Sequence, residues 1–173
     1  MKTQEKSYSE DKLLPYNGFS EASFRGYIIM QMTQHFTLEE LTHSDIGARL
    51  GFDNTPNSSE IENLKRLADL LETVRSVLGR PIQINSAFRS KAVNDAVKSK
   101  DSSQHRVGCA ADIRVSGMTP DDVVRCLITA NVPYDQLIRE FDSWTHISVP
   151  NNKNDVPRKQ VLIIDQKGTR TYP

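Results

Sequence analysis

The longest regular pattern of apolar positions lies between residues 59 and 78. Ser59 followed by Glu62 is a capping box that starts a helix, and Gly79 with Pro81 ends it. The pattern predicts an amphipathic helix that builds the core and carries no chemistry. Its apolar side chains recur at the i, i+3, i+4, i+7 spacing of one helix face, at Ile61, Leu64, Leu67, Ala68, Leu71, Val74 and Leu78.

Shorter helices are predicted from the residues that precede them. Thr37 and Glu40 form another capping box, and Ser90 can cap a second short helix. The third opens with Thr119 as the cap and Pro120 at its first helical position, followed by two acids that suit the helix dipole. These helices are expected over about residues 38–43, 91–97 and 120–130.

Strands are predicted where apolar and polar positions alternate or where β-branched residues cluster. Most of them follow one another at hairpin-length spacing after the first helices, which predicts an α+β domain. We expect a mainly antiparallel sheet with the helices packed on one side. The segments are PIQINSAF (81–88), CAADIRV (109–115), QLIREF (136–141), WTHISV (144–149) and KQVLIID (159–165).

The pattern also divides the 173 residues of the chain into one domain with extensions at both ends. Residues 1–33 contain few apolar side chains and no sustained period, so we expect a poorly ordered N-terminal extension. The domain is expected over residues 34–165, with a C-terminal tail over 166–173.

Composition excludes several classes of protein. The 22 basic and 22 acidic residues balance and are scattered, which argues against a nucleic-acid partner. No apolar run reaches the roughly 18 residues of a membrane span, and the N-terminal region lacks the apolar core of a secretory signal. We expect a protein made in the cytoplasm, without membrane insertion, in which Cys109 and Cys126 are buried thiols rather than a disulfide.

Candidate chemistry begins in SQHRVGCAAD, residues 103–112. Alone, His105 is most often a core or surface residue, and Asp112 at a strand centre could be paired with Arg114 or Arg139. However, a carboxylate is costly to bury without a partner or a cation, and His146 also lies at a strand centre. Two histidines and one aspartate make the three-ligand set of a catalytic zinc, with a fourth position left for water.

These residues carry a resemblance to a known family. The stretch fits S-x-H-x-x-G-x-A-x-D, and W-T-H follows downstream. It is similar to the zinc D-Ala-D-Ala carboxypeptidases and phage L-alanyl-D-glutamate endopeptidases, which belong to the LAS group of peptidoglycan metallopeptidases. The resemblance covers roughly residues 34–150 and implies a hedgehog/DD-peptidase-like fold with zinc on His105, Asp112 and His146. The matching residues are Ser103, His105, Gly108, Ala110, Asp112 and His146.

The same resemblance assigns residues that contact the substrate. Arg89, in N-S-A-F-R-S, stands where the family places an arginine that holds a substrate carboxylate, and a planar guanidinium suits that grip. The alternative is a surface arginine that caps the next helix. Ser103 is expected to form a hydrogen bond near the site or to cap a loop. Trp144 is either a wall for the substrate or a packing residue.

The general base departs from the family pattern. Many relatives have E-x-x-H at the last zinc histidine, but this chain has Ser143 at the glutamate position. If Asp142, Ser143 and Trp144 form a three-residue hairpin loop, Glu140 lies directly opposite His146 on the same sheet face. Glu140 is therefore the predicted base. Asp142, or a base from another segment, stays the alternative.

The expected function is zinc-dependent hydrolysis of peptidoglycan stem peptides. In this interpretation Glu140 takes the proton of the zinc-activated water and Arg89 positions the substrate. The resemblance implies a phage or prophage endolysin that is made in the cytoplasm and acts on the cell wall. We expect it to be a monomer. A noncatalytic zinc-stabilised binding module is the main alternative, supported by the missing E-x-x-H glutamate. A metal-free α+β interaction domain is the third hypothesis.

Overall fold

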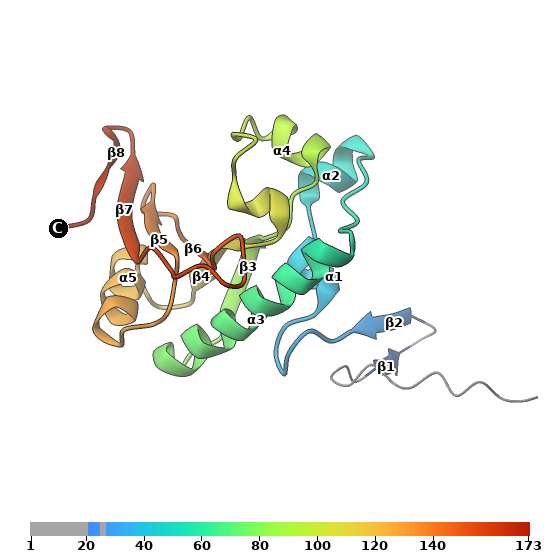
Figure 1. Ribbon diagram of the computed structural model, residues 1–173, viewed down its shortest axis with the longest axis horizontal. Helices are drawn as coiled ribbons and strands as arrows, with labels where there is room; N and C mark the ends of the chain where they lie inside the picture. Colours follow the sequence, from blue (N-terminus) through green and yellow to red (C-terminus); the bar gives the residue numbers. More distant parts are fainter. Residues whose placement is uncertain (1–20, 25–26) are drawn as a thin grey trace, which may run out of the picture.

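A computed structural model describes residues 21–24 and 27–173, with side chains described from Met30 onward. Its centre is a six-stranded sheet with the strand order β3-β4-β6-β5-β7-β8 (Figure 1). All neighbouring strands in this sheet are antiparallel except β5 and β7, which are parallel. The predicted α+β class with a mainly antiparallel sheet is therefore confirmed. The strands are β3 (Ile82–Ser86), β4 (Ala110–Val115), β5 (Gln136–Glu140), β6 (Trp144–Ser148), β7 (Gln160–Asp165) and β8 (Gly168–Thr171).

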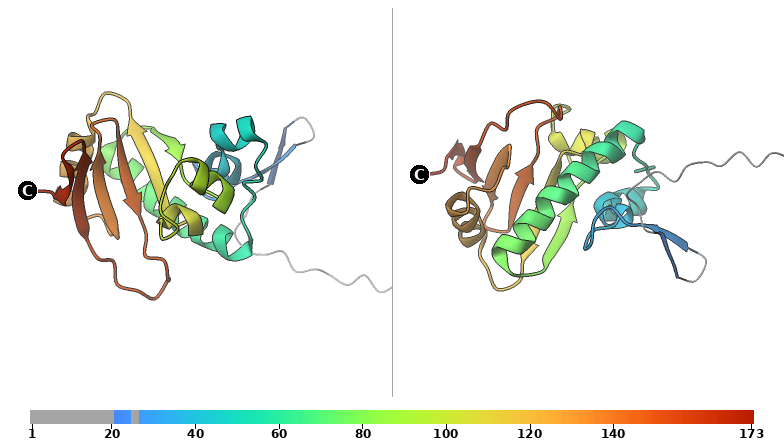
Figure 2. Two further views of the ribbon diagram at one scale, coloured as in Figure 1. Left: turned by 90° about the horizontal axis from the view of Figure 1, so that it is seen from above. Right: turned by 60° about the horizontal axis from the view of Figure 1, so that its bottom comes forward.

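Helices cover one face of this sheet and one of its ends. The long α3 crosses one face, with α5 beside it near the end of the sheet formed by β8 (Figure 2). The short α4 and η1 lie beside β4, toward the other end of the sheet. The helices are α1 (Leu38–Thr42), α2 (Asp45–Leu50), α3 (Ser58–Leu78), α4 (Lys91–Ala96), α5 (Pro120–Thr129) and the 3-10 helix η1 (Gln104–Val107).

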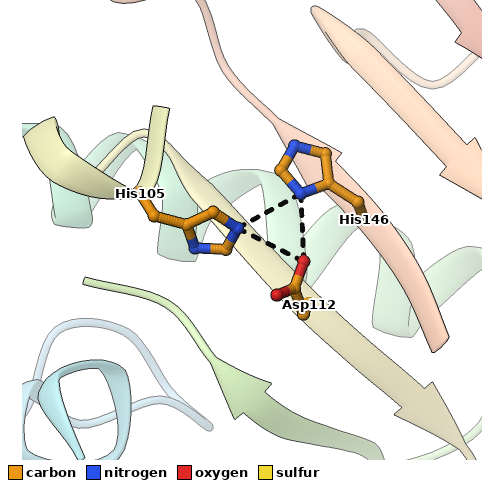
Figure 3. A group of neighbouring side chains, drawn as sticks. All are labelled: His105, Asp112 and His146. Atoms are coloured by element: carbon orange, nitrogen blue, oxygen red, sulfur yellow. Dashed lines mark hydrogen bonds and ion pairs between the residues drawn. The ribbon is translucent and has the colours of Figure 1, made fainter. Parts of the chain in front are cut away.

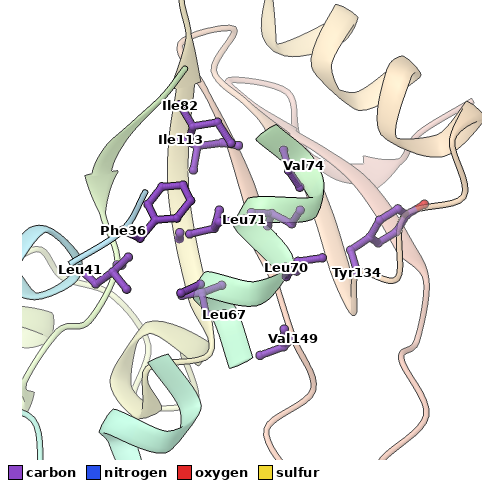
Figure 4. Packing of buried hydrophobic residues seen from close by; sticks show 14 of the residues in the cluster. Phe36, Leu41, Leu67, Leu70, Leu71, Val74, Ile82, Ile113, Tyr134 and Val149 are labelled. Carbon is purple, nitrogen blue, oxygen red and sulfur yellow. The ribbon is translucent and has the colours of Figure 1, made fainter. Parts of the chain in front are cut away.

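The core lies between α3 and the sheet. Leu67, Leu71 and Val74 form part of the buried stripe of α3, which packs toward Ile113 of β4 (Figure 4). The apolar spacing predicted this face correctly, because the 3.6-residue period places these positions along one side of a helix. Since successive strand residues alternate between faces, the neighbours of Ile113 in β4 face the side of the sheet that α3 leaves open.

The start of α3 differs from the prediction. The capping box is formed by Asn57 and Glu60 rather than by Ser59 and Glu62. The Asn57 side chain accepts hydrogen bonds from the main-chain N–H groups of Ser59 and Glu60, and Glu60 accepts one from that of Asn57. Both pairs have the capping-box spacing, but Asn57 at the earlier position caps the helix. The helix therefore begins at Ser58, two residues before the start that a Ser59 cap would give.

Among the elements that were not predicted are α2 and β8. The helix α2 is too short to show a periodic pattern, and its cap is Ser44. The expected C-terminal tail contains β8, which pairs with β7, and Tyr172 then donates a 2.7 Å hydrogen bond from its hydroxyl to Oδ1 of Asp121. The residues from 166 onward thus continue the sheet, although their exposed side chains gave no apolar pattern.

The N-terminal extension is described only in part. Residues 1–20 and 25–26 lie outside the described residues, so the expected disorder there stays a prediction. Strands β1 (Glu21–Phe24) and β2 (Tyr27–Met30) pair as a separate two-stranded sheet. Met32 is 4% exposed and belongs to the core cluster. Core packing therefore begins before residue 34, the expected start of the domain. In the described part of the chain, no helix has the length and apolar character to cross a membrane.

Candidate metal centre

Three separate elements bring His105, Asp112 and His146 together on the open face of the sheet. His105 comes from η1, Asp112 from β4 and His146 from β6. Asp112 and His146 are direct partners in the antiparallel register of β4 and β6, so their side chains leave the sheet on the same face. The two rings and the carboxylate point toward one another (Figure 3). All three residues are at most 8% exposed.

The geometry of this group fits a tetrahedral metal ion. Nε2 of His105 lies 3.2 Å from Oδ1 of Asp112 and 3.2 Å from Nδ1 of His146, and the latter two atoms are 3.0 Å apart. Zinc bonds of about 2.0–2.1 Å at tetrahedral angles separate the ligand atoms by about 3.3 Å. The residues can therefore hold one metal ion, as nitrogen and oxygen donors that zinc accepts.

The orientation of His105 is fixed by the main chain. Its Nδ1 lies 2.6 Å from the carbonyl oxygen of Ala87, an acceptor, so Nδ1 carries the proton and Nε2 presents its lone pair. Burial lowers the pKa of His105, which favours the neutral imidazole. The main-chain N–H of Arg89 also donates to the carbonyl of His105, at 3.1 Å. The segment 87–89 thus holds both the ring and the backbone of this histidine.

Asp112 is held as a carboxylate. Burial alone would raise its pKa, but the interactions of the carboxylate with the rings of His105 and His146 outweigh burial and hold the pKa of Asp112 well below its usual range. An ionised carboxylate and a neutral imidazole are the forms in which these residues bind metals. The protonation states of Asp112 and His105 therefore suit a cation.

The ion pair of Asp112 is formed with Arg89. Nη2 of Arg89 donates to Oδ2 of Asp112 at 2.6 Å, and its Nε donates to Oγ of Ser86 at 2.8 Å. The sequence had suggested Arg114 or Arg139 as partners of Asp112, and both suggestions are wrong. Arg114 lies on the same face but donates to the carbonyl of Ser143. Arg139 faces the other side of the sheet, because it neighbours Glu140 in β5.

Arg139 pairs there with Asp121 and Asp142. The position of Asp142 also bears on the alternative base. Asp142 lines a small pocket of about 290 Å³ whose lining does not include His146, and it is not among the residues that line the groove at His146. Asp142 is thus not brought to the candidate metal centre.

A side chain that the sequence did not single out holds the Arg89 loop. The Asn54 amide donates to the carbonyls of Thr42 and Phe88 and accepts from the N–H of Ser90, at 2.7, 3.2 and 2.7 Å. Two of these bonds flank Arg89, so Asn54 fixes the turn that carries it. Asn54 lies in a polar loop without periodicity, and no sequence signal distinguished it from other loop residues.

Glu140 reaches the site with a different strand register from the predicted one. It pairs with Trp144, and His146 pairs with Ile138. The loop consists of Phe141, Asp142 and Ser143, which shifts the pairing by two residues. The predicted face is nevertheless correct, because a shift of two preserves the alternation of side chains. Glu140 is thus a diagonal neighbour of His146, rather than its direct partner.

The environment of Glu140 suits a proton acceptor. The Nε1–H of Trp144 donates to its Oε2 at 2.6 Å. Burial, together with the nearby negative charge of Asp112, raises the pKa of Glu140 above the usual value of a glutamate. A raised pKa brings a carboxylate closer to the range in which it can accept a proton and then release it. Trp144 therefore orients the predicted base.

A broad groove of about 1820 Å³ runs over the open face of the sheet. It is lined by the three residues of the candidate metal centre together with Arg89, Glu140 and Trp144. Ser103 also lines it and makes no side-chain capping bond to η1, so its hydroxyl is not engaged as a helix cap. Lys98 and Lys100 stand on the wall beside Ser103.

A second buried polar cluster connects η1 to Asp135 and to the segment that follows β6. The Gln104 amide donates to Oδ2 of Asp135 and to the carbonyl of Val149, at 3.0 and 2.9 Å. Arg158 binds both carboxylate oxygens of Asp135. Because Gln104 precedes His105, this cluster fixes η1 relative to the loop that follows β6. The sequence gave no signal for it, since its members are far apart along the chain.

The donor atoms and the groove are those of a metal-dependent peptidase. A comparison with protein families agrees with this class. The profile of the Peptidase M15 family matches residues 34–148, which is more than half of the chain. The chain belongs to this family, and the resemblance to LAS-type zinc peptidases of peptidoglycan is confirmed. No curated protein matches the chain.

Proposed function

We propose that this protein is a zinc-dependent peptidase that cleaves the stem peptides of peptidoglycan. The observation that carries the proposal is the convergence of Nε2 of His105, Oδ1 of Asp112 and Nδ1 of His146 within 3.2 Å of one another. These atoms lie in a groove wide enough for a peptide, in a chain of the Peptidase M15 family. They are the proposed zinc ligands.

The residues around this group supply the remaining parts of a hydrolytic reaction. Bound zinc would polarise the scissile carbonyl and lower the pKa of a coordinated water toward about 7. Glu140 accepts the proton of the attacking water and passes it to the leaving amine. The indole of Trp144 holds one carboxylate oxygen of Glu140 and leaves the other available for the proton.

In this proposal, Arg89 orients the zinc ligand Asp112. Its hydrogen bond to Oδ2 leaves Oδ1 of Asp112 directed at the metal position. Because Arg89 also lines the groove, it can attract a substrate carboxylate from there. Ser103 is proposed as a further polar contact of the substrate.

The finer assignments rest on the family resemblance. We propose that the scissile bond is either D-Ala–D-Ala or L-Ala–D-Glu. The proposed setting is a phage or prophage endolysin that acts as a monomer, is made in the cytoplasm and reaches the cell wall during lysis.

Hydrolysis of purified peptidoglycan tests this proposal. New amino groups should appear on incubation with the zinc-loaded protein, and mass spectrometry of the products identifies the cleaved bond. A chelator should stop the reaction. If zinc-loaded protein releases no amino groups while zinc remains bound, the noncatalytic zinc module replaces the enzyme.

A further inference from the structure

Phe141 occupies a backbone conformation that does not favour a phenylalanine. Its φ is 49°, in the left-handed region, and the φ of the following residue Asp142 is also 49°. Glycine and asparagine adopt this region at low cost, whereas a bulky side chain there is an outlier. The backbone conformation of the turn between β5 and β6 therefore does not explain why residue 141 is a phenylalanine.

Core packing does not explain the side chain either. Phe141 is 49% exposed and does not belong to the core cluster. Its main-chain N–H donates a 2.8 Å hydrogen bond to the carbonyl of Ile164, which fixes the loop whatever the side chain is. A strained residue that is neither buried nor needed for its backbone bond indicates a functional contact.

The side chain of Phe141 lines the groove, on the side of the predicted base. Its ring centroid lies 6.1 Å from that of Trp144, which holds Glu140. Asp142 next to it lines the small pocket instead. Phe141 and Trp144 together form an aromatic rim at the edge of the groove.

The floor beside this rim is apolar. Strand register places Ile138 opposite His146 and next to Leu162, and places Glu140 next to Ile164. Ile138, Leu162 and Ile164 all line the groove and form an apolar patch. This patch begins at the metal group and extends toward β8, whereas Arg89 lies on the other side of Asp112, toward β3.

We propose that Phe141 is a specificity-determining residue, which with the apolar patch receives the methyl group of an alanine beside the scissile bond. This inference rests on the proposed function. Alanine adjoins both bonds considered there, and a methyl group matches the apolar side chains of Ile138, Leu162 and Ile164, which lie beside Glu140. The Phe141 ring would contact this methyl group from the edge of the groove, and this contact would offset the cost of its backbone conformation.

The test uses the zinc-loaded protein and the synthetic pentapeptide L-Ala-D-Glu-L-Lys-D-Ala-D-Ala. Binding is read from the fluorescence of Trp144, the single tryptophan of the chain, before hydrolysis proceeds. In Phe141→Asn the melting temperature should stay the same or rise, because asparagine tolerates the left-handed conformation. Its Kd should rise by about three- to tenfold through loss of the aromatic contact, while Phe141→Tyr should bind like the wild type.

A peptide series identifies the occupant. Each alanine of the pentapeptide is replaced by glycine in turn. One of these replacements should weaken binding to the wild type by about three- to fivefold, the effect of one buried methyl group. The same replacement should have little effect on Phe141→Asn, because that variant has lost the contact.

The outcomes separate this inference from the proposed function. Binding that depends on Phe141 without any hydrolysis would support the subsite and overturn the peptidase. Hydrolysis with equal Kd in wild type and Phe141→Asn would overturn the subsite alone. A lower melting temperature in Phe141→Asn with unchanged Kd would show that the ring only packs. Absence of binding by the wild type would overturn both.

Discussion

The guanidinium of Arg89 donates a 2.6 Å hydrogen bond to Oδ2 of Asp112, while Oδ1 of the same carboxylate faces the rings of His105 and His146. The family resemblance had assigned Arg89 to the substrate. In the structure its first contact is with a proposed zinc ligand, and partners of this kind orient the ligand. Arg89 thus connects metal binding to the groove.

Arg89→Ala should therefore lower zinc affinity as well as activity. Loss of the partner of a metal ligand costs about 10–100-fold in metal affinity. Competition with a chromophoric chelator measures this change, and kcat/KM is measured separately at saturating zinc. Arg89→Lys should restore part of both, because it keeps the charge but lacks the planar fork. Unchanged zinc affinity with reduced kcat/KM would assign Arg89 to the substrate alone.

Glu140→Gln should abolish most hydrolysis without unfolding the protein or releasing the metal. The amide keeps the size of the side chain and can still accept the indole hydrogen bond, but it cannot take a proton from water. We expect a fall of on the order of 10²–10⁴ in kcat, with zinc content and melting temperature preserved. Wild-type turnover in this variant would remove Glu140 from the mechanism.

Two neighbouring substitutions serve as controls for this assignment. Asp142→Asn should reduce kcat far less than Glu140→Gln, because Asp142 pairs with Arg139 on the other side of the sheet. Adding Ser143→Glu to Glu140→Gln places a carboxylate at the commoner family position. If that double variant recovers activity, the loop can place a base over the metal. If Asp142→Asn loses as much activity as Glu140→Gln, the assignment of the base is wrong.

Asp135 should make stability depend on pH. Burial alone would raise its pKa, but hydrogen bonds from Arg158 and Gln104 outweigh burial and lower it. A carboxylate whose pKa is lower in the folded state stabilises the protein above its unfolded pKa of about 3.9, and this contribution is lost as the pH falls through the folded value. Asp135→Asn should therefore be less stable at pH 7, by about 2–3 kcal/mol, and the difference should shrink below about pH 4.

Urea unfolding at pH 7 and pH 3 measures this difference. A matched control is Asp101→Asn, which removes the carboxylate of a far more exposed ion pair with Lys91. Pairs near the surface contribute little, so this variant should unfold like the wild type at both pH values. An Asp135→Asn variant whose deficit is the same at both pH values would show that the Asp135 charge contributes nothing.

The helices and strands with a periodic pattern of apolar residues were predictable from the sequence. The apolar period of α3 and the alternation in β4 and β6 follow from helix and strand geometry, so core faces and site faces were assigned correctly. His105, Asp112 and His146 were found because a histidine and an aspartate at strand centres need a reason to be buried. Their convergence in space was expected from the residue types of a three-ligand zinc site, and the family resemblance supported it.

The parts that depend on contacts between distant residues were not predictable. The register of β5 and β6 is set by a loop with Phe141 and Asp142 in the left-handed region, which a phenylalanine does not favour. Asn54 and Gln104 act through partners tens of residues away. Nothing in their local sequence distinguishes them from other polar loop residues.

The central claim is that one zinc on His105, Asp112 and His146 is required for hydrolysis. Titration of zinc into chelator-treated protein, with peptidoglycan hydrolysis measured at each step, tests it most directly. Activity should rise in proportion to added zinc and reach its plateau at about one equivalent per chain, and His146→Ala should show neither tight binding nor recovery. Full hydrolysis by the chelated protein, or equal recovery in His146→Ala, would contradict the account.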